Sequence, residues 1–186
     1  MLKKLRWSDY VFGVFLLLLI IPQTRKPIQV AVNKAKILVW SPSIKAVEDQ
    51  AQLIPFDYKV LSLDGKPKTI GVGKGKVTFI SYWATWCALC LAELPNIEKL
   101  YVDYGEHINF VLLTNEAQET VTTFLKKKPY TLPMYTSRMA PPPLLLDKSI
   151  PTNYLIDQNG KIMSKATGAA DWNSKKVRSV IDALLE

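Results

Sequence analysis

The two cysteines of this chain lie three residues apart, in the segment Trp86-Cys87-Ala88-Leu89-Cys90. The preceding residues 77–83 form an apolar run that predicts a buried β-strand, and residues 91–104 have the pattern of an amphipathic helix. A Cys-x-x-Cys pair at the turn from a strand into a helix is typical of a thiol–disulfide redox site. The first sulfur would lie at the helix N-terminus, where free N–H groups and the helix dipole stabilise a thiolate.

A Cys-x-x-Cys pair can also be half of a zinc site or a structural disulfide. Zinc requires four ligands, and this chain contains no further cysteine and a single histidine, His107. A complete Cys/His zinc site within one chain is therefore excluded, although a site shared between chains is not. A disulfide across so short a loop adds little constraint on the unfolded chain, so the pattern favours redox chemistry.

The basic charge of the chain is concentrated near its N-terminus. The 186 residues carry a net charge of +8, and 48% of them are hydrophobic, which is enough for a core without additional cross-links. Residues 1–50 contain eight Lys/Arg and three Asp/Glu, whereas residues 51–186 contain sixteen and thirteen. A basic excess beside an apolar segment suits a membrane surface better than a nucleic-acid groove. We therefore expect no nucleic-acid partner.

An uncharged, strongly apolar run covers residues 10–21 and follows three basic residues within the first six positions. This order is that of a signal peptide, but no small-x-small cleavage site follows, so we expect residues 1–22 to be a retained membrane anchor. As a helix the run spans roughly 18 Å, against a hydrocarbon core of about 30 Å. Extending it to Trp7, with snorkelling Lys and Arg side chains, narrows the gap. A buried or amphipathic surface helix is the alternative, but the run is apolar on every face.

The anchor predicts where the rest of the chain lies. With three basic residues before the apolar run, the N-terminus is expected in the cytoplasm. The remainder would then lie on the extracytoplasmic (periplasmic) side of the cytoplasmic membrane. We expect residues 23–50, which Pro27, Pro42 and several lysines interrupt, to be a membrane-proximal linker with local structure, and residues 51–186 to form the folded domain.

The pattern after residue 50 predicts one α/β domain. Strands alternate with helices, and the chain ends in a hairpin followed by a helix that Asn173 or Ser174 would cap. This order indicates a central mixed β-sheet flanked by helices. The expected strands cover residues 56–63, 66–72, 77–83, 108–113, 132–135, 153–156 and 161–166, and the expected helices cover 91–104, 116–127 and 173–185.

Three stretches of this domain resemble the membrane-anchored TlpA/ResA-like disulfide reductases, which have a thioredoxin-like fold. Residues 79–90, FISYWATWCALC, are similar to the F-W-A-x-W-C-x-x-C of that family, and Glu93-Leu94-Pro95 matches its C-x-x-C-x-x-E-x-P continuation. Residues 150–162, IPTNYLIDQNGKI, resemble P-T-x-x-[VIL]-I-D-x-x-G-x-I. The resemblance covers roughly residues 53–186. It implies a thioredoxin-like fold with an N-terminal β-hairpin and an inserted strand and helix within residues 116–148.

The resemblance implies a role for each matched residue. Cys87 would attack a partner disulfide, and Cys90 would resolve the mixed disulfide. Pro151 would be a cis-proline facing the cysteines, with Ile150 beside it contacting the substrate backbone. A cis X-Pro bond is far cheaper than other cis bonds, and it leaves neighbouring backbone groups free to pair with an extended peptide. The alternative for Pro151 is an ordinary proline at a strand start. Trp86 would form a lip beside the site and contact the substrate.

Glu93 is expected to exchange a proton with Cys90. It follows Cys90 by three residues, so the two side chains share a helix face, which should point toward the sheet. Burial there would raise the pKa of the carboxyl and let it accept and return the Cys90 proton near neutral pH. Thioredoxins have a buried Asp six residues before the first cysteine, where this chain has Ser81. The alternative is a surface Glu that stabilises the first helical turn.

These features predict extracytoplasmic thiol–disulfide exchange, most simply the reduction of protein disulfides with electrons from a membrane dithiol donor. In the family this often serves cytochrome c maturation. We expect a monomer that needs no cofactor and no metal beyond the Cys87–Cys90 pair. A disulfide oxidase or isomerase remains an alternative, because the Ala88-Leu89 dipeptide does not fix the direction of exchange. A Cu(I) metallochaperone is another, although the related copper proteins have C-x-x-x-C spacing; the spacing also argues against a peroxidase.

Overall fold

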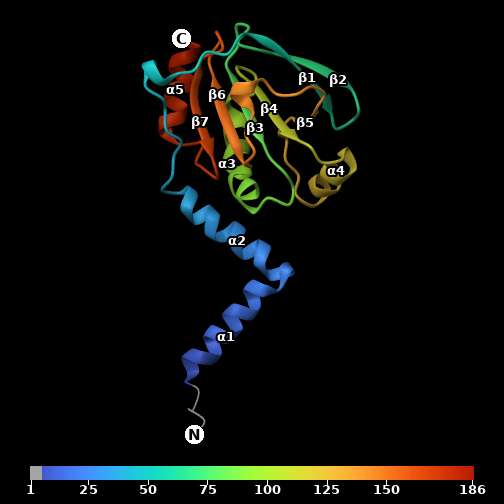
Figure 1. The fold of residues 1–186 in the computed structure, drawn as a ribbon, viewed down its shortest axis with the longest axis vertical. Coiled ribbons are helices and arrows are strands. Elements are labelled where there is room, and N and C mark those ends of the chain that lie inside the picture. Colours follow the sequence, from blue (N-terminus) through green and yellow to red (C-terminus); the bar gives the residue numbers. More distant parts are fainter. Residues whose placement is uncertain (1–5) are drawn as a thin grey trace.

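A seven-stranded mixed sheet forms the centre of the structure, a computed structural model that describes residues 6–186 (Figure 1). Its strands lie in the order β2-β1-β5-β4-β3-β6-β7. Strands β3, β4 and β5 run parallel to one another, and all other neighbours are antiparallel. The strands are β1 (Phe56–Ser62), β2 (Pro67–Val72), β3 (Thr78–Tyr82), β4 (Asn109–Thr114), β5 (Met134–Ser137), β6 (Thr152–Ile156) and β7 (Ile162–Thr167). The helices are α1 (Trp7–Ile20), α2 (Pro22–Ile37), α3 (Ala88–Tyr104), α4 (Gln118–Lys127) and α5 (Lys175–Leu185), with short 3-10 helices η1 (Val47–Asp49) and η2 (Pro143–Leu145).

Alternating side chains of the central strands build two apolar cores, one on each face of the sheet. Neighbouring residues of a strand point to opposite faces, so Phe79 and Ile80 of β3 belong to different cores. The first core joins the sheet to α3, α4 and α5 and includes Phe79, Phe110, Leu155, Ile97, Val121 and Ile181. The second core includes Ile80, Val111, Tyr154, Tyr58 and Leu145. The helix that carries the cysteines is therefore packed on the first face.

The α/β fold with a central mixed sheet, predicted from the sequence, is confirmed. The N-terminal hairpin is β1–β2, and Gly65 adopts a positive φ of 82° in its turn. The inserted helix and strand are α4 and β5, the latter beginning two residues later than predicted. Of the two residues predicted to cap the last helix, Ser174 does so, since its side chain accepts a hydrogen bond from the backbone N–H of Val177.

The local structure expected within the linker of residues 23–50 is a regular helix, α2, which begins at Pro22 and ends at Ile37. Pro22 lies in its first turn, where the missing N–H has no partner to lose, and Pro27 is accommodated inside it. The helix packs against α3 of the domain, and its last residue, Ile37, is buried. Such contacts with a distant element stabilise a helix that local propensity alone does not predict.

The two N-terminal helices extend from one end of the domain as a bent stalk (Figure 1). Helix α1 has 14 residues and so rises about 21 Å. Within residues 6–186 no helix combines the length and the apolar character needed to cross a membrane. The membrane helix expected within residues 1–22 is therefore without support in the structure, and residues 1–5 lie outside its described part.

Replacing a core residue of α3 tests the packing of this helix on the sheet. Ile97 is fully buried, whereas Val102 of the same helix is 70% exposed. We expect Ile97→Ala to lower the free energy of unfolding by about 2–5 kcal/mol, because it leaves a cavity. Val102→Ala should change it by less than about 0.5 kcal/mol. Urea unfolding of both variants makes the comparison, and equal effects would contradict this packing.

Candidate active site

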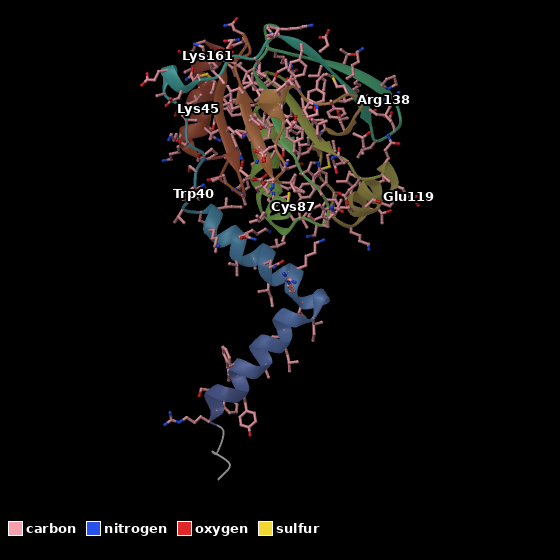
Figure 2. All side chains as sticks on the ribbon, viewed as in Figure 1. Trp40, Lys45, Cys87, Glu119, Arg138 and Lys161 are labelled. Atoms are coloured by element: carbon pink, nitrogen blue, oxygen red, sulfur yellow. A yellow bond between two sulfur atoms is a disulfide. The ribbon has the colours of Figure 1, made fainter. Side chains whose placement is uncertain are left out.

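Cys87 and Cys90 form a disulfide at the start of α3. Cys87 is the N-cap residue of the helix, and its Sγ accepts a hydrogen bond of 3.1 Å from the backbone N–H of Cys90. This cap starts α3 at Ala88, three residues before the predicted start. Cys87 is 6% exposed and Cys90 is fully buried, so another molecule can reach the sulfur of Cys87 more easily. Figure 2 shows Cys87 at the end of the domain nearest α2.

The peptide bond between Ile150 and Pro151 is cis, and Ile150 lies against the disulfide. Sγ of Cys87 is 3.8 Å from the carbonyl oxygen of Ile150. Among residues 6–186, the N–H and carbonyl of Ile150 pair with no other backbone group. Pro151 is buried, and its carbonyl accepts a hydrogen bond of 2.8 Å from the N–H of Gly168. The structure therefore brings Cys87, from one sequence motif, next to Ile150 and Pro151, from another.

Trp86 lies beside Cys87 with 65% of its surface exposed. Together with Ile150 it borders two clefts. One has a volume of about 600 Å³ and also contains Cys87. The other has a volume of about 440 Å³ and reaches Tyr82 and Glu116 on the far side of Trp86. Trp86 therefore lies next to Cys87 at the border of both clefts.

Glu93 lies one helical turn after Cys90 and is 1% exposed. Loss of hydration raises the pKa of its carboxyl to about 8. Two hydrogen bonds oppose this rise: Oε1 accepts one of 2.8 Å from Nδ2 of Asn153, and Oε2 accepts one of 3.3 Å from the N–H of Ala170. The carboxyl thus points into the protein rather than to solvent, and its protonation changes close to neutral pH.

Asn153, which sequence reasoning missed, is the side chain that orients Glu93. It lies on β6, paired in register with Ser81 of β3. Oδ1 of Asn153 and Oγ of Ser81 are buried and, within the described residues, have no hydrogen-bond partner. Both side chains are polar, and neither carries a charge. The sequence did contain a signal for Asn153. Side chains alternate along β6, so Asn153 points to the same face as Leu155, which packs in the core next to α3.

Glu116, also missed from the sequence, holds the loop that leads into the disulfide. Its carboxylate accepts hydrogen bonds from the backbone N–H of Thr85, at 2.6 Å, and from the Thr85 hydroxyl, at 2.7 Å. On the other side, Nζ of Lys26 donates to the Thr85 carbonyl at 2.9 Å. Glu116 follows β4, which is parallel to β3, and carboxyl ends of parallel neighbours meet at one edge of a sheet. The position of Glu116 shortly after the predicted strand of residues 108–113 was therefore the signal in the sequence that it lies near the cysteine loop.

A family model described as Redoxin matches residues 46–184. The chain belongs to the Redoxin family. The resemblance to ResA-like oxidoreductases stated from the sequence motifs is confirmed by the relatives, among them a thiol-disulfide oxidoreductase ResA of Bacillus cereus. It is 30% identical over 125 residues, which cover 60% of this chain and 66% of the relative, just under two thirds of its length.

Further similar proteins span more of the chain. The sporulation thiol-disulfide oxidoreductase A of Bacillus subtilis (strain 168) is 23% identical over 153 residues, covering 78% of this chain and 91% of the relative. A crystal structure of a thiol:disulfide interchange protein of the thioredoxin family from Chlorobium tepidum TLS is 25% identical, with a TM-score of 0.56. It covers 73% of this chain and 100% of the other. The fold of this Redoxin-family chain is thus thioredoxin-like, as predicted.

Burial of Glu93 predicts that stability falls as the pH rises between about 4.5 and about 8. Because the pKa in the folded state, about 8, lies above the ordinary 4.5, the folded protein keeps a proton that the unfolded chain has released. The free energy of unfolding should therefore decrease by up to about 1.4 kcal/mol per pH unit in this range. Urea unfolding of the oxidised chain at several pH values measures the slope.

The matched variants are Glu93→Gln and Glu119→Gln. The first removes the buried titrating group, so its slope should be shallower than that of the unmodified chain. The second alters an exposed carboxylate of α4 and should keep the original slope. If the unmodified chain and Glu93→Gln lost stability equally over this range, the buried carboxyl would not have the raised pKa.

Proposed function

We propose that this protein is a thiol–disulfide oxidoreductase that reduces disulfide bonds of protein substrates. The carrying observation is the Cys87–Cys90 pair at the N-terminus of α3, with one sulfur accessible, the other buried, and Glu93 one turn further along the helix. The ResA relative and the sporulation relative are both named thiol-disulfide oxidoreductases, which supports the same class of reaction here. About a third of the ResA relative lies outside the match, so the substrate class rests on this chain's own site.

In the proposed reaction the reduced enzyme carries two thiols. The Cys87 thiolate, stabilised at the start of α3, attacks one sulfur of the substrate disulfide. A mixed disulfide forms, and the other substrate sulfur leaves as a thiolate. Cys90 then attacks Sγ of Cys87, which releases the second substrate thiol and forms the Cys87–Cys90 disulfide. Two electrons pass to the substrate, and a membrane dithiol donor returns them to the enzyme.

Glu93 is proposed to accept the proton of Cys90 during the second step and to return it when the disulfide is reduced again. Its position one turn after Cys90 and its pKa near 8 support this role. Ile150 is proposed to pair its N–H and carbonyl, which have no backbone partner among residues 6–186, with an extended substrate segment. Trp86 would border this segment in the cleft, and Pro151 would hold Ile150 in place beside it. The Cys87–Cys90 pair then needs no further cofactor.

We further propose that the reaction takes place on the extracytoplasmic side of a membrane. The apolar run at residues 10–21, preceded by three basic residues, supports an anchor, and a redox cysteine pair suits an oxidising compartment. Cytochrome c maturation, which the family resemblance implies, needs reduced Cys-x-x-Cys-His segments and fits this activity. We propose a monomer with no nucleic-acid partner.

Trapping of the mixed disulfide tests the proposed function. Cys90→Ser lacks the resolving thiol, so substrate proteins should remain linked to Cys87. The control Cys87→Ser keeps only the buried Cys90 and should give roughly tenfold fewer adducts or less, because thiol exchange requires access to the sulfur. Non-reducing electrophoresis of cells that express each full-length variant shows the adducts, which a reductant should release.

The identity and number of the trapped proteins test the proposed compartment, the proposed nucleophile and the proposed substrate class. Adducts with exported cysteine-containing proteins would agree with the proposed compartment, and adducts with cytoplasmic proteins alone would contradict it. Equal adduct levels in Cys87→Ser and Cys90→Ser would contradict Cys87 as the nucleophile. The absence of adducts from both variants would contradict protein substrates.

The proposed role of Glu93 predicts a change in the pH profile of exchange. In the unmodified enzyme, the single-turnover rate of substrate release should depend on a group with a pKa near 8. Glu93→Gln should lose this dependence and slow substrate release by about tenfold near neutral pH. This effect is smaller than that of many general bases, because a thiol ionises readily without help. Stopped-flow measurement across pH gives the profile, with Glu119→Gln as the control. A profile identical to that of the unmodified enzyme would refute proton exchange by Glu93.

A further inference from the structure

Helix α2 is connected to the site more closely than a linker would be. It packs against α3, and Nζ of its Lys26 donates a hydrogen bond to the carbonyl of Thr85, in the loop before the cysteines. Figure 2 shows the helix running beneath the end of the domain at which Cys87 lies. The segment before the folded domain therefore forms part of the surroundings of the disulfide.

The cleft of about 600 Å³ that contains Cys87 lies between α2 and the domain. Four of its residues are on α2, at a spacing that puts them on one helix face, and the rest come from the disulfide turn and from the cis-proline loop. Both groups are uncharged, and most of the side chains are apolar. The lining residues are Ile28, Gln29, Val32 and Asn33 from α2, and Trp86, Cys87, Ala88, Leu89 and Ile150 from the domain.

A partner sulfur that reaches Cys87 enters this cleft. Cys90 is fully buried and Cys87 is only slightly exposed, and Cys87 lines this cleft but not the neighbouring one beyond Trp86. The residues that flank the reacting sulfur would then lie between α2 on one side and Ile150 on the other. The side chains that flank the substrate cysteine must therefore fit against the α2 residues that line the cleft.

We propose that α2 forms the second wall of the substrate cleft and selects polypeptide segments whose reacting cysteine is flanked by apolar, uncharged side chains. This inference rests on the proposed function. Ile28 and Val32 give the wall apolar surface, and Val32 is 52% exposed and so free to contact a ligand. A charged side chain would lose water there, and none of the side chains that line the cleft carries a charge to compensate. A cationic one would also meet the basic charge of α2, which carries two Lys or Arg residues before Ile28 and two after Val32 and no acidic residue.

A comparison of two peptide substrates tests the proposal with the purified full chain. Each peptide carries one cysteine in a disulfide with a chromogenic thiol, flanked on both sides by Leu in one peptide and by Lys in the other. We expect the unmodified enzyme to prefer the Leu peptide in kcat/KM. Val32→Asp should lower this preference by about tenfold or more, as expected for a poorly matched apolar subsite. Val32→Trp, which fills the cleft, should raise KM for the Leu peptide.

Ala35→Asp is the matched control, because it adds the same charge to an exposed position of α2 that does not line the cleft. It should keep the preference of the unmodified enzyme, and circular dichroism should show that all three variants are folded. The inference is overturned if the unmodified enzyme does not prefer Leu, or if Val32→Asp and Ala35→Asp change the preference equally. If the unmodified enzyme reduces neither peptide and also fails to exchange with dithiothreitol, the proposed function fails, and the inference with it. Exchange without a preference defeats the inference alone.

Discussion

Packing of α3 on the central sheet determines both the stability and the chemistry of this protein. The buried face of the helix carries Ile97 and Leu100 in the apolar core, and the same face carries Cys90 and Glu93 near its start. These apolar residues hold the helix against the sheet, so the sulfur of Cys90 and the carboxyl of Glu93 are kept out of water. Hydration of Glu93 would return its pKa toward the ordinary value of a carboxyl, since loss of water is the largest cause of the shift.

The rest of the site is built where separate parts of the chain reach the same end of the sheet. Parallel strands β3 and β4 end side by side, so the loop through Thr85 meets the carboxylate of Glu116. Strand β6 is antiparallel to β3 and therefore begins at this end, which brings Ile150 to Cys87. The directions of these strands thus bring together residues that are 31 and 63 positions apart in sequence.

Short-range patterns predicted the parts of this arrangement that depend on neighbours in sequence. The strand before Cys87, the helix after it and the inward direction of Glu93 follow from periodicity, and the family motifs indicated Pro151. What they did not predict depends on contacts between distant segments. Lysines and Pro27 obscure the helical pattern of α2, which gains its burial from α3. Neither Glu116 nor Asn153 has a motif of its own, because Glu116 acts on Thr85 in a distant loop and Asn153 acts on Glu93 of α3.

The hydrogen bond between Lys26 and Thr85 gives the N-terminal helices a direct connection to the reactive turn. Thr85 also donates a hydrogen bond to Glu116, so the loop is bonded to the folded domain through Glu116 and to α2 through Lys26. A displacement of α2 would be transmitted to this loop without passing through the sheet. Contacts that fix the position of α1 and α2 therefore also help to set the position of Sγ of Cys87 relative to an incoming substrate sulfur.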